Sequence, residues 1–406
     1  MSSNYSPITT NLKMDGVDIG SIYITKDFLI DRYPELSDQL KSATMYCWGA
    51  GNANNQLSLV QSLTSSPTIL PSNNSSWRRL AVNHNSLHRA AIKTDGTLWL
   101  WGRNAAGQLG DTSTVNRTLI QATDTEWVDV ACGNDFTMVL SYGVGGARQT
   151  YATGNNFYGQ LGDGTTTNRT TLAFAAEANA VQISCGNYHT SFINTSGQLW
   201  SMGYNGVGCL GDGTVIRKSA PVQTISGGSN WKQVAVGGDS TLAIKTDGTL
   251  WGWGENGRGQ LGDGTLVNKS SPVQTVTGGT NWKNVSCGDL VTGAIKTDGT
   301  LWMWGYNLYG QLADGTTADK SSPVQTVSGG TNWRQVNPSV NHCAAIKTDG
   351  TLWTWGFNSS GQLGDSTTVN KSSPVQTTLG GTNWKTVTCT TSGVIAITDN
   401  SEDLWL

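Results

Sequence analysis

Three histidines have the residue type and the regular spacing from which a metal or proton-transfer site could be built. His88, His189 and His342 each stand four residues before an isoleucine of an apolar segment. An imidazole there could ligate a metal or titrate near neutral pH. In the other copies of the segment the same position holds unrelated residues, namely Phe136, Ser240, Val291 and Gly393. We therefore expect packed or hydrogen-bonded histidines and no metal.

Carboxylates recur beside glycines in a pattern that could suggest calcium loops. The sequence L-G-D-G-T or a close variant contributes one aspartate to each of six turns: Asp111, Asp163, Asp212, Asp263, Asp314 and Asp365. A calcium loop needs several converging oxygen ligands, so one aspartate per turn is too few. We expect these side chains to cap nearby backbone N–H groups instead. The same expectation holds for the T-D-G-T turns at Asp95, Asp247, Asp298 and Asp349.

Other reactive groups lack the context that catalysis needs. Four of the seven cysteines share one repeat position and no C-x-x-C pair occurs, which is typical of small buried hydrophobic residues. The serines have no nucleophile elbow. The glycine-rich segment Asn256–Gly262 precedes no helix that could hold a phosphate. The sequence therefore predicts no enzyme, no cofactor and no metal site.

The elements that position these residues belong to a repeat of about 51 residues. A W-G or equivalent dipeptide recurs with spacings of 49 to 53 residues, ending at Gly49, Gly102, Gly154, Gly203, Gly254, Gly305 and Gly356. Each unit contains four strand-like pieces, such as Trp282–Cys287, Ala294–Lys296, Leu301–Trp304 and Ser322–Thr326. Because proline cannot donate to a ladder, the last piece is expected at the blade edge. A fixed period and four strands per unit predict a propeller.

The number of units predicts seven blades in an all-β, seven-bladed β-propeller that spans residues 45–406. The first pieces begin at Trp77, Trp127, Ala180, Trp231, Trp282, Trp333 and Trp384. The chain enters and leaves in mid-unit, so strands from both of its ends must close the last blade. Met45–Gly49 and Asp403–Leu406 compete for the third strand of that blade, and we favour Met45–Gly49.

The motifs G-x-L-W-x-W-G, N-x-x-G-Q-L-G, S-P-V and V-x-C-G resemble the regulator-of-chromosome-condensation repeat family over residues 45–406. The resemblance implies a closed seven-bladed propeller. The founding activity of that family is nucleotide exchange on a small nuclear GTPase while docked on chromatin. Residues 1–44 hold four Lys/Arg against six Asp/Glu, which is the wrong charge for phosphate contacts. The only obvious insertion, at 141–150, does not resemble a wedge for nucleotide release.

Residues 1–44 are expected to form an attachment segment. Residues 13–36 are similar in style to attachment segments of tailed-phage virion proteins, particularly those of marine phages, which also carry such propellers. Thr25 could cap a helix over 26–33, and Pro34 could open a second helical stretch to about Lys41. An apolar side for anchoring comes from Phe28, Leu29, Tyr33, Leu36 and Leu40. Helical turns this short need a surface to bury that side.

Composition excludes several classes of partner. The 406 residues carry a formal net charge of −3, which gives no global attraction to nucleic acid or to an anionic membrane. The sequence contains no apolar run of about 18 residues, so membrane insertion is not expected. The N-terminus lacks the basic start and the apolar core of a signal peptide, so synthesis in a cytoplasm is expected.

Binding residues are expected where the repeat frame stays constant and the side chain changes. Such positions follow each W-G and should lie on one rim of the ring. They include Arg103, Phe157, Tyr158, Tyr204, Glu255, Arg258, Tyr306, Tyr309 and Phe357. Aromatic side chains there could stack on sugar rings or anchor a protein contact. The alternative is ordinary loop variation, with aromatic rings covering neighbouring loops.

The leading functional hypothesis is a non-enzymatic, structural or adhesive virion protein of the tail-fibre, capsid-fibre or decoration type. Residues 1–44 would bind other virion proteins, and the propeller would face a host surface protein or glycan. The alternative is a cellular propeller scaffold, or a regulator like a guanine-nucleotide-exchange factor, that binds a protein partner. The sequence leaves open whether the protein forms a homo-oligomer.

Overall fold

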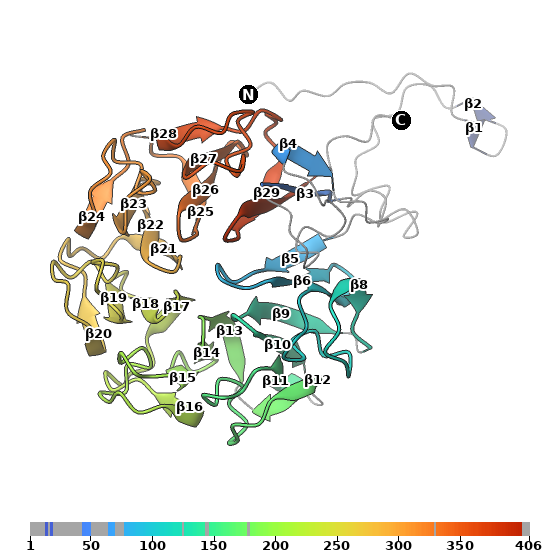
Figure 1. The fold of residues 1–406 in the computed structure, drawn as a ribbon, viewed down its shortest axis with the longest axis vertical. Helices are drawn as coiled ribbons and strands as arrows, with labels where there is room; N and C mark the ends of the chain where they lie inside the picture. Colours follow the sequence, from blue (N-terminus) through green and yellow to red (C-terminus); the bar gives the residue numbers. More distant parts are fainter. Residues whose placement is uncertain are drawn as a thin grey trace.

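The computed structural model describes residues 13–14, 17–18, 43–49, 64–69, 77–123, 126–142, 146–176, 179–328 and 330–399. For residues 13–14, 17–18 and 64–69 it describes the backbone only. Seven antiparallel four-stranded sheets form a closed ring (Figure 1). The prediction of a seven-bladed propeller with four-stranded blades is confirmed.

The innermost strand of each blade comes from the W-x-x-V piece. Its first residue is buried, and the fourth residue of each six-residue inner strand is buried too. These strands are β5 (Trp77–Ala81), β9 (Trp127–Cys132), β13 (Ala180–Cys185), β17 (Trp231–Val236), β21 (Trp282–Cys287), β25 (Trp333–Pro338) and β29 (Trp384–Cys389).

The second and third strands are buried almost along their whole length, as expected for the middle of a blade. The second strands are β6 (His88–Lys93), β10 (Phe136–Tyr142), β14 (His189–Asn194), β18 (Ser240–Lys245), β22 (Val291–Lys296), β26 (His342–Lys347) and β30 (Gly393–Thr398). The third strands are β7 (Leu98–Gly102), β11 (Arg148–Gly154), β15 (Leu199–Gly203), β19 (Leu250–Gly254), β23 (Leu301–Gly305), β27 (Leu352–Gly356) and β3 (Met45–Gly49).

The outermost strands are the proline-containing pieces in most blades, as predicted, because a proline is tolerated only at a sheet edge. They are β8 (Arg117–Gln121), β12 (Arg169–Ala176), β16 (Lys218–Gln223), β20 (Lys269–Gln274), β24 (Lys320–Gln325), β28 (Lys371–Gln376) and β4 (Thr64–Ile69). We number the blades 1 to 7 by their inner strands, from β5 to β29.

Blade 7 is shared between the two ends of the chain. Its strand order is β29-β30-β3-β4, and β3 pairs with β30 from Met45 opposite Ile397 to Gly49 opposite Gly393 (Figure 1). The favoured choice of Met45–Gly49 as third strand is therefore confirmed. The competing segment 403–406 lies outside the described residues.

The hydrophobic core lies between neighbouring blades. One cluster joins Leu301 and Met303 of blade 5 to Trp333 and Trp355 of blade 6, and comparable clusters fill other junctions. Trp304 shows how polar atoms are satisfied at a junction, since its Nε1 donates to the Gln260 carbonyl of the preceding blade at 2.9 Å. The ring is thus held by contacts that each blade makes with its neighbours.

The repeated chemical groups serve this scaffold. His88 Nε2 and Thr137 Oγ1 of the next blade are 2.9 Å apart, and His189 makes the equivalent bond to Thr241 at 3.0 Å. Burial lowers the pKa of both histidines to about 3. His342 is likewise buried and bonded to the next blade. All seven cysteines are free and buried, so both predictions of structural roles are confirmed.

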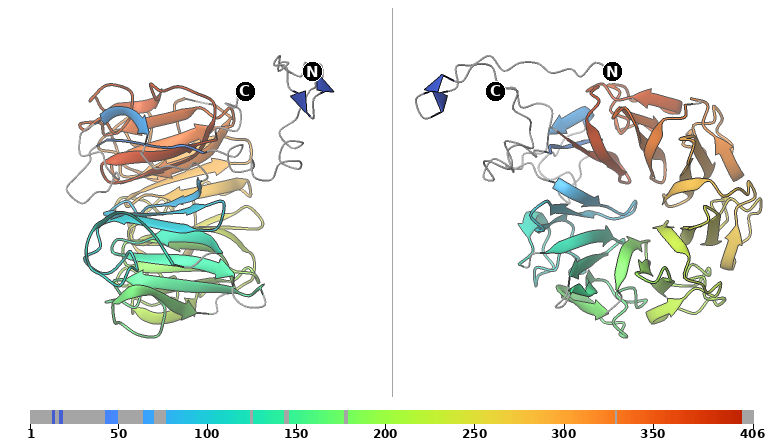
Figure 2. Two further views of the ribbon diagram at one scale, coloured as in Figure 1. Left: turned by 90° about the vertical axis from the view of Figure 1, so that its right-hand side faces the viewer. Right: turned by 180° about the vertical axis from the view of Figure 1, so that it is seen from behind.

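The ring has two unlike faces. Connections between the first and second strands and between the third and fourth strands lie on one face, which we call the loop face. The tight T-D-G-T turns and the links between blades lie on the other, which we call the turn face. In the left-hand view of Figure 2 the long loops project from one side of the ring.

At the N-terminus, β1 (Lys13–Met14) pairs with β2 (Val17–Asp18) in a small antiparallel sheet that the sequence did not predict. The helical turns predicted over 26–41, with all five anchoring residues, lie outside the described residues. Within the described part of the chain there is no helix long and apolar enough to cross a membrane.

Candidate functional site

The loop face displays its side chains from two short segments of each blade. In blades 1 to 6 the residue after W-G or its equivalent donates its backbone N–H to the carbonyl of the residue just before the second strand, as from Glu255 to Asp239 at 2.9 Å. Gly254 makes this approach possible, because it has a φ of 96° and an added Cβ would collide with the Asp239 carbonyl. In each of these six blades, the variable residue that precedes the second strand therefore lies next to the variable residue that follows W-G.

A network of hydrogen bonds fixes the frame of each long loop. In blade 4 the Asn256 Nδ2 donates to Asp263 Oδ1 at 3.0 Å, and the Thr265 backbone N–H donates to the same oxygen at 2.9 Å. Lys269 Nζ lies 3.4 Å from Asp263 Oδ2. Burial opposes ionisation of Asp263, but the bonds from Thr265 and Asn256 and the charge of Lys269 together outweigh it and lower the pKa. The predicted capping role is confirmed, and the ion pair was not anticipated.

All nine predicted binding residues lie in the long loops of the loop face. Phe157 is 61% exposed and Arg258 is exposed, whereas the others are half-buried. They are spread over blades 1 to 6, so residues of neighbouring blades meet and residues of distant blades do not. The nine are Arg103, Phe157, Tyr158, Tyr204, Glu255, Arg258, Tyr306, Tyr309 and Phe357.

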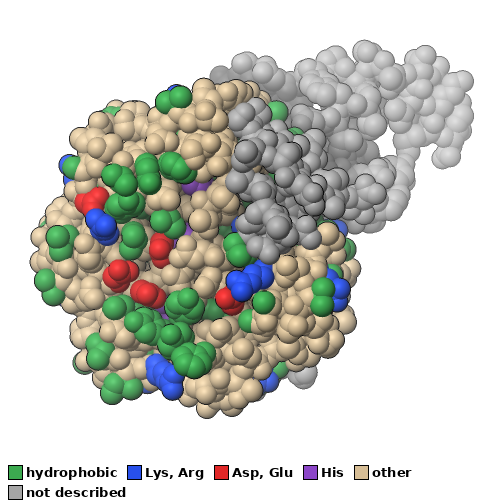
Figure 3. Space-filling view, in the orientation of Figure 1, with side chains coloured by type: hydrophobic (Ala, Val, Ile, Leu, Met, Phe, Trp, Pro, Cys, Tyr) green, Lys and Arg blue, Asp and Glu red, His purple; other side chains and the backbone are tan. Residues whose placement is uncertain are grey.

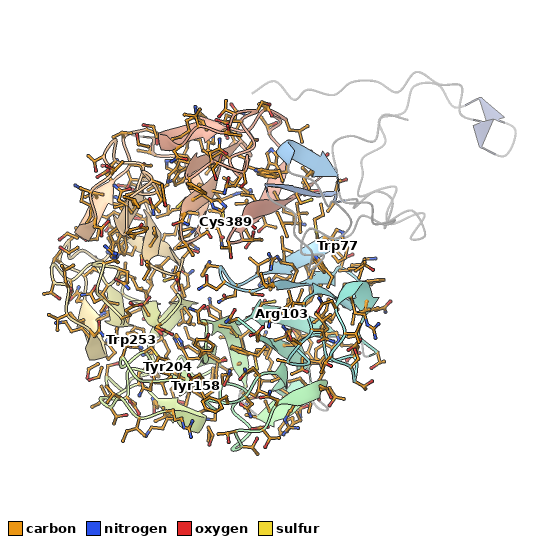
Figure 4. All side chains as sticks on the ribbon, viewed as in Figure 1. Trp77, Arg103, Tyr158, Tyr204, Trp253 and Cys389 are labelled. Atoms are coloured by element: carbon orange, nitrogen blue, oxygen red, sulfur yellow. The ribbon has the colours of Figure 1, made fainter. Side chains whose placement is uncertain are left out.

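Tyr158, Tyr188 and Tyr204 form what we call the tyrosine cluster. The ring centroid of Tyr158 lies 5.4 Å from that of Tyr188 and 5.2 Å from that of Tyr204. Phe157 extends the cluster, with its centroid 4.9 Å from that of Tyr158. Figure 4 shows Tyr158 and Tyr204 next to each other on neighbouring loops. Aromatic pairs in this geometry attract each other beyond their burial.

A second aromatic group lies farther along the ring. Tyr309 and Phe357 have centroids 4.7 Å apart, and the Arg258 guanidinium lies 5.0 Å from the centroid of Tyr306. Arg258 also pairs with Asp319 at 3.2 Å. Its charge is therefore already engaged by a carboxylate and a ring.

Arg103 stands apart from both aromatic groups. Its Nη1 lies 3.6 Å from Asp135 Oδ1, which belongs to the first loop of the next blade. Figure 4 shows Arg103 on a different part of the ring from Tyr158 and Tyr204. Glu255 lies between the two aromatic groups, because its charge acts on Tyr204 and the charge of Arg258 acts on it. Among the nine predicted residues, Arg103 is the one set apart from the others.

Asp239, Glu255 and Asp289 form what we call the acidic cluster. Burial, together with the charges of Glu255 and Asp289, raises the pKa of Asp239 to about 6. Burial and the charge of Asp289 also raise the pKa of Glu255. On the face shown in Figure 3, acidic side chains lie toward the middle of the ring among hydrophobic ones. Only Glu255 of the three was predicted as a site residue.

The residues missed by sequence reasoning come from the first loop of each blade. Asp135, Tyr188, Asp239 and Asp289 all lie in three-residue connections such as G-N-D and G-G-D. These resemble ordinary turns, but their side chains change from blade to blade while the frame stays constant. The criterion that selected the residues after W-G would have selected them too.

One first loop is longer than the others and caps the central channel. Residues 82–87 carry Asn85, whose Nδ2 donates to Asn187 Oδ1 at 3.2 Å, and Asn187 Nδ2 donates to Asp289 Oδ1 at 3.1 Å. These bonds link blades 1, 3 and 5 across the ring. A cavity of about 660 Å³ lies among the inner strands. The segment 141–150 was therefore not the only insertion in the repeat.

The described residues contain no group of three His, Cys, Asp or Glu side chains placed to hold a metal ion. The arrangement of the loop face is instead one of rings, hydroxyls and carboxylates on a rigid frame. Such a surface combines contact area with charge, which are the features of protein-binding faces.

The RCC1-like domain, as a family model, matches residues 44–398 of the chain. The chain belongs to the RCC1-like domain family. The match spans all seven blades described above, and it confirms the repeat family that the motifs predicted.

Relatives of this RCC1-like chain carry different activities in their names. The ultraviolet-B receptor UVR8 of Arabidopsis thaliana is 31% identical over 317 residues, which cover 73% of this chain and 69% of UVR8. The human RCC1-like G exchanging factor-like protein is 28% identical over 305 residues, covering 66% and 64%. The human probable E3 ubiquitin-protein ligase HERC6 is 31% identical over 262 residues, covering 60% of this chain but 25% of the ligase.

Solved structures agree on the fold. Human WBSCR16 superposes with a TM-score of 0.74 at 22% identity, covering 87% of this chain and 99% of that protein. Yeast RCC1 (Prp20), in its complex with Kap60, has a TM-score of 0.75 at 18% identity, covering 88% and 89%. At these identities the likeness shows the RCC1-like propeller fold alone.

Proposed function

We propose that this RCC1-like propeller is a scaffold or regulator that binds a protein partner through its loop face. The observation that carries the proposal is the concentration of variable aromatic and charged side chains on that face. Tyr158, Tyr204 and Phe357 are held on a hydrogen-bonded frame that repeats from blade to blade. Rigid aromatic side chains lose little entropy on binding and are enriched at protein interfaces.

The names of the relatives support a regulatory role without fixing one activity. They include a receptor, ubiquitin-protein ligases and an exchange-factor-like protein. The yeast propeller of the same fold was solved bound to another protein, Kap60. A receptor, a ligase and an exchange factor each bind other proteins, and a propeller with a variable face can supply that binding surface.

The binding role can be tested by comparing partners retained by two surface variants of the full chain. One variant carries Phe157→Ser, Tyr204→Ser and Phe357→Ser on the loop face. The matched variant carries Thr246→Ser, Thr297→Ser and Thr348→Ser on the turn face. Quantitative mass spectrometry should show partners lost only from the first variant. Equal retention by both variants, with both folded, would contradict the proposal.

An exchange factor is the narrower form of this proposal. The relative named as an exchange-factor-like protein supports it, and a nucleotide-release assay with a panel of small GTPases tests it. Acceleration of nucleotide release by the wild-type chain would favour exchange over scaffolding. Binding of a partner without faster nucleotide release would favour the scaffold role.

The virion hypothesis rests on residues 1–44, of which the structure describes 13–14, 17–18 and 43–44. The relatives named above do not include a virion protein, so the regulator is the better-supported proposal. Mass spectrometry of purified particles tests the hypothesis of a virion component, and absence from mature particles would end it.

A further inference from the structure

We propose that the acidic cluster on blade 4 receives a lysine or arginine side chain from the protein partner. The inference rests on the proposed function, because it names the chemistry that the loop face would recognise. Hydrogen-bond acceptors without donors, a buried imidazole and an aromatic wall meet at one place on this face.

The carboxylates of the cluster form no ion pair within the described part of the chain, and the charge of Arg258 only partly offsets the rise in the pKa of Glu255. The ion pairs of the described residues include none with Asp239, Glu255 or Asp289. Asp239 Oδ1 is buried and receives no hydrogen bond from the described residues. A buried acceptor of this kind is costly unless a donor reaches it. The cluster therefore favours a ligand rich in N–H groups and positive in charge.

His84 adds a second buried polar atom without a partner, on an element other than those that carry the carboxylates. Its side chain is 6% exposed, and its Nδ1 has no hydrogen-bond partner among the described residues. Burial lowers the pKa of His84, and the nearby charge of Asp289 only partly opposes this effect. The lowered pKa favours the neutral imidazole, which offers one nitrogen lone pair to an ammonium or guanidinium N–H.

Gly238 explains why the cluster forms on blade 4. In the middle of the three-residue first loops, the other blades carry side chains: Asn134, Asn187, Asp289, Val340 and Thr391. A Cβ at Gly238 would collide with the Asp289 carboxylate and approach Asn187 Nδ2 at 3.1 Å. The absence of a side chain lets Asp289 of blade 5 lie over blade 4, close to Asp239.

The tyrosine cluster supplies a wall beside these acceptors. Burial raises the pKa of Tyr204, and the charges of Asp239 and Glu255 contribute, so both carboxylates lie within electrostatic range of the ring. Tyr158 meets Tyr204 edge to face, with the ring centroids 5.2 Å apart. A cation between a tyrosine ring and a carboxylate gains from both, whereas an anionic partner would be repelled.

The experiment measures binding of a fluorescein-labelled 12-residue peptide, (Gly-Ser-Lys)₄, to the full-length chain by fluorescence anisotropy. The comparison peptide carries acetyl-lysine at the same four positions. We expect tighter binding of the lysine peptide, and a rise of about tenfold in its dissociation constant in the Asp239→Asn/Asp289→Asn variant. Both asparagines keep the size of the side chain and remove the charge.

The matched control is Asp247→Asn/Asp298→Asn, which changes the net charge equally on the turn face. This variant should bind the lysine peptide within about twofold of wild type. Equal affinity for the two peptides, or equal weakening by the two double variants, would overturn the inference. Either of these results could occur while the triple loop-face variant (Phe157→Ser, Tyr204→Ser and Phe357→Ser) still loses its partners. In that case the proposed protein binding is supported and the inference of cation recognition is wrong.

Discussion

The two faces of the ring are built from the same repeat, yet they differ in what the repeat holds constant. On the turn face, the Lys296 ammonium lies 4.9 Å from the ring centroid of Trp282 and 4.3 Å from that of Trp302. Blades 1, 4 and 6 repeat this stack with their own lysine and tryptophans. On the loop face, the equivalent positions of successive blades hold tyrosine, glutamate, tyrosine and phenylalanine.

The difference shows where sequence freedom is allowed. The tryptophan that fills a junction between blades recurs in five of the seven, as Trp48, Trp101, Trp253, Trp304 and Trp355, because its loss would open the junction. A residue held by the backbone of its own blade, such as Glu255, can change without disturbing the ring. Stability and recognition are thus assigned to different positions of one repeat, as solenoid and propeller proteins permit.

The largest expected effect is on a junction residue. Trp304 is fully buried and donates to Gln260, so Trp304→Ala should lower the free energy of unfolding by about 3–5 kcal/mol. The loop-face control Phe157→Ala, at an exposed side chain, should stay within about 0.5 kcal/mol of wild type. Urea denaturation followed by circular dichroism measures both. Comparable losses of unfolding free energy in the two variants would contradict the distinction between junction residues and loop-face residues.

Acid should weaken the ring through its buried histidines. The pKa of His189 in the folded protein is about 3 because of burial, against 6.5 in its ordinary state. The unfolded chain therefore binds the extra proton first, and the stability that His189 contributes is lost as the pH falls from 6.5 toward 3.

Val291 occupies the same position in blade 5, so His189→Val is the natural variant. Between pH 6 and pH 4 the free energy of unfolding of this variant should fall less steeply than that of wild type. The two slopes should differ by up to about 1.4 kcal/mol per pH unit. Parallel pH profiles of the two proteins would contradict this account of the histidine.

A smaller effect is expected within the loop frame. Asp263→Ala removes the acceptor for Asn256 and Thr265, which should cost about 1–3 kcal/mol. Asp298→Ala in an exposed turn of the turn face should cost less, because water replaces its bonds. Thermal unfolding of both variants makes the comparison, and a larger loss from Asp298→Ala would reverse it.

Most of the scaffold could be predicted from the sequence because its signals are local and repeated. Blade number follows from the W-G spacing, and the capping role of Asp263 follows from its glycine-rich turn. The ion pair of Asp263 with Lys269 was missed, since it joins a turn to the outer strand. Residues 1–44 contributed a hypothesis that the described residues do not test.

The candidate site was predicted only in part, for a physical reason. The residues after W-G were found because they vary beside a motif, whereas Asp239 and Asp289 stand in short glycine-rich turns. Their meeting depends on the closure of the ring and on the missing side chain at Gly238. His84 belongs to a capping loop whose contacts cross the ring, which no local pattern indicates.

Site-specific photo-crosslinking tests the central claim that partners bind the loop face. A benzophenone amino acid is placed at Phe157 or Phe357 on the loop face, and at Thr246 or Thr297 on the turn face, in cells that express the full chain. We predict discrete crosslinked species from the two loop-face positions, which disappear with an excess of the unmodified protein. Crosslinks confined to the turn-face positions would contradict the claim.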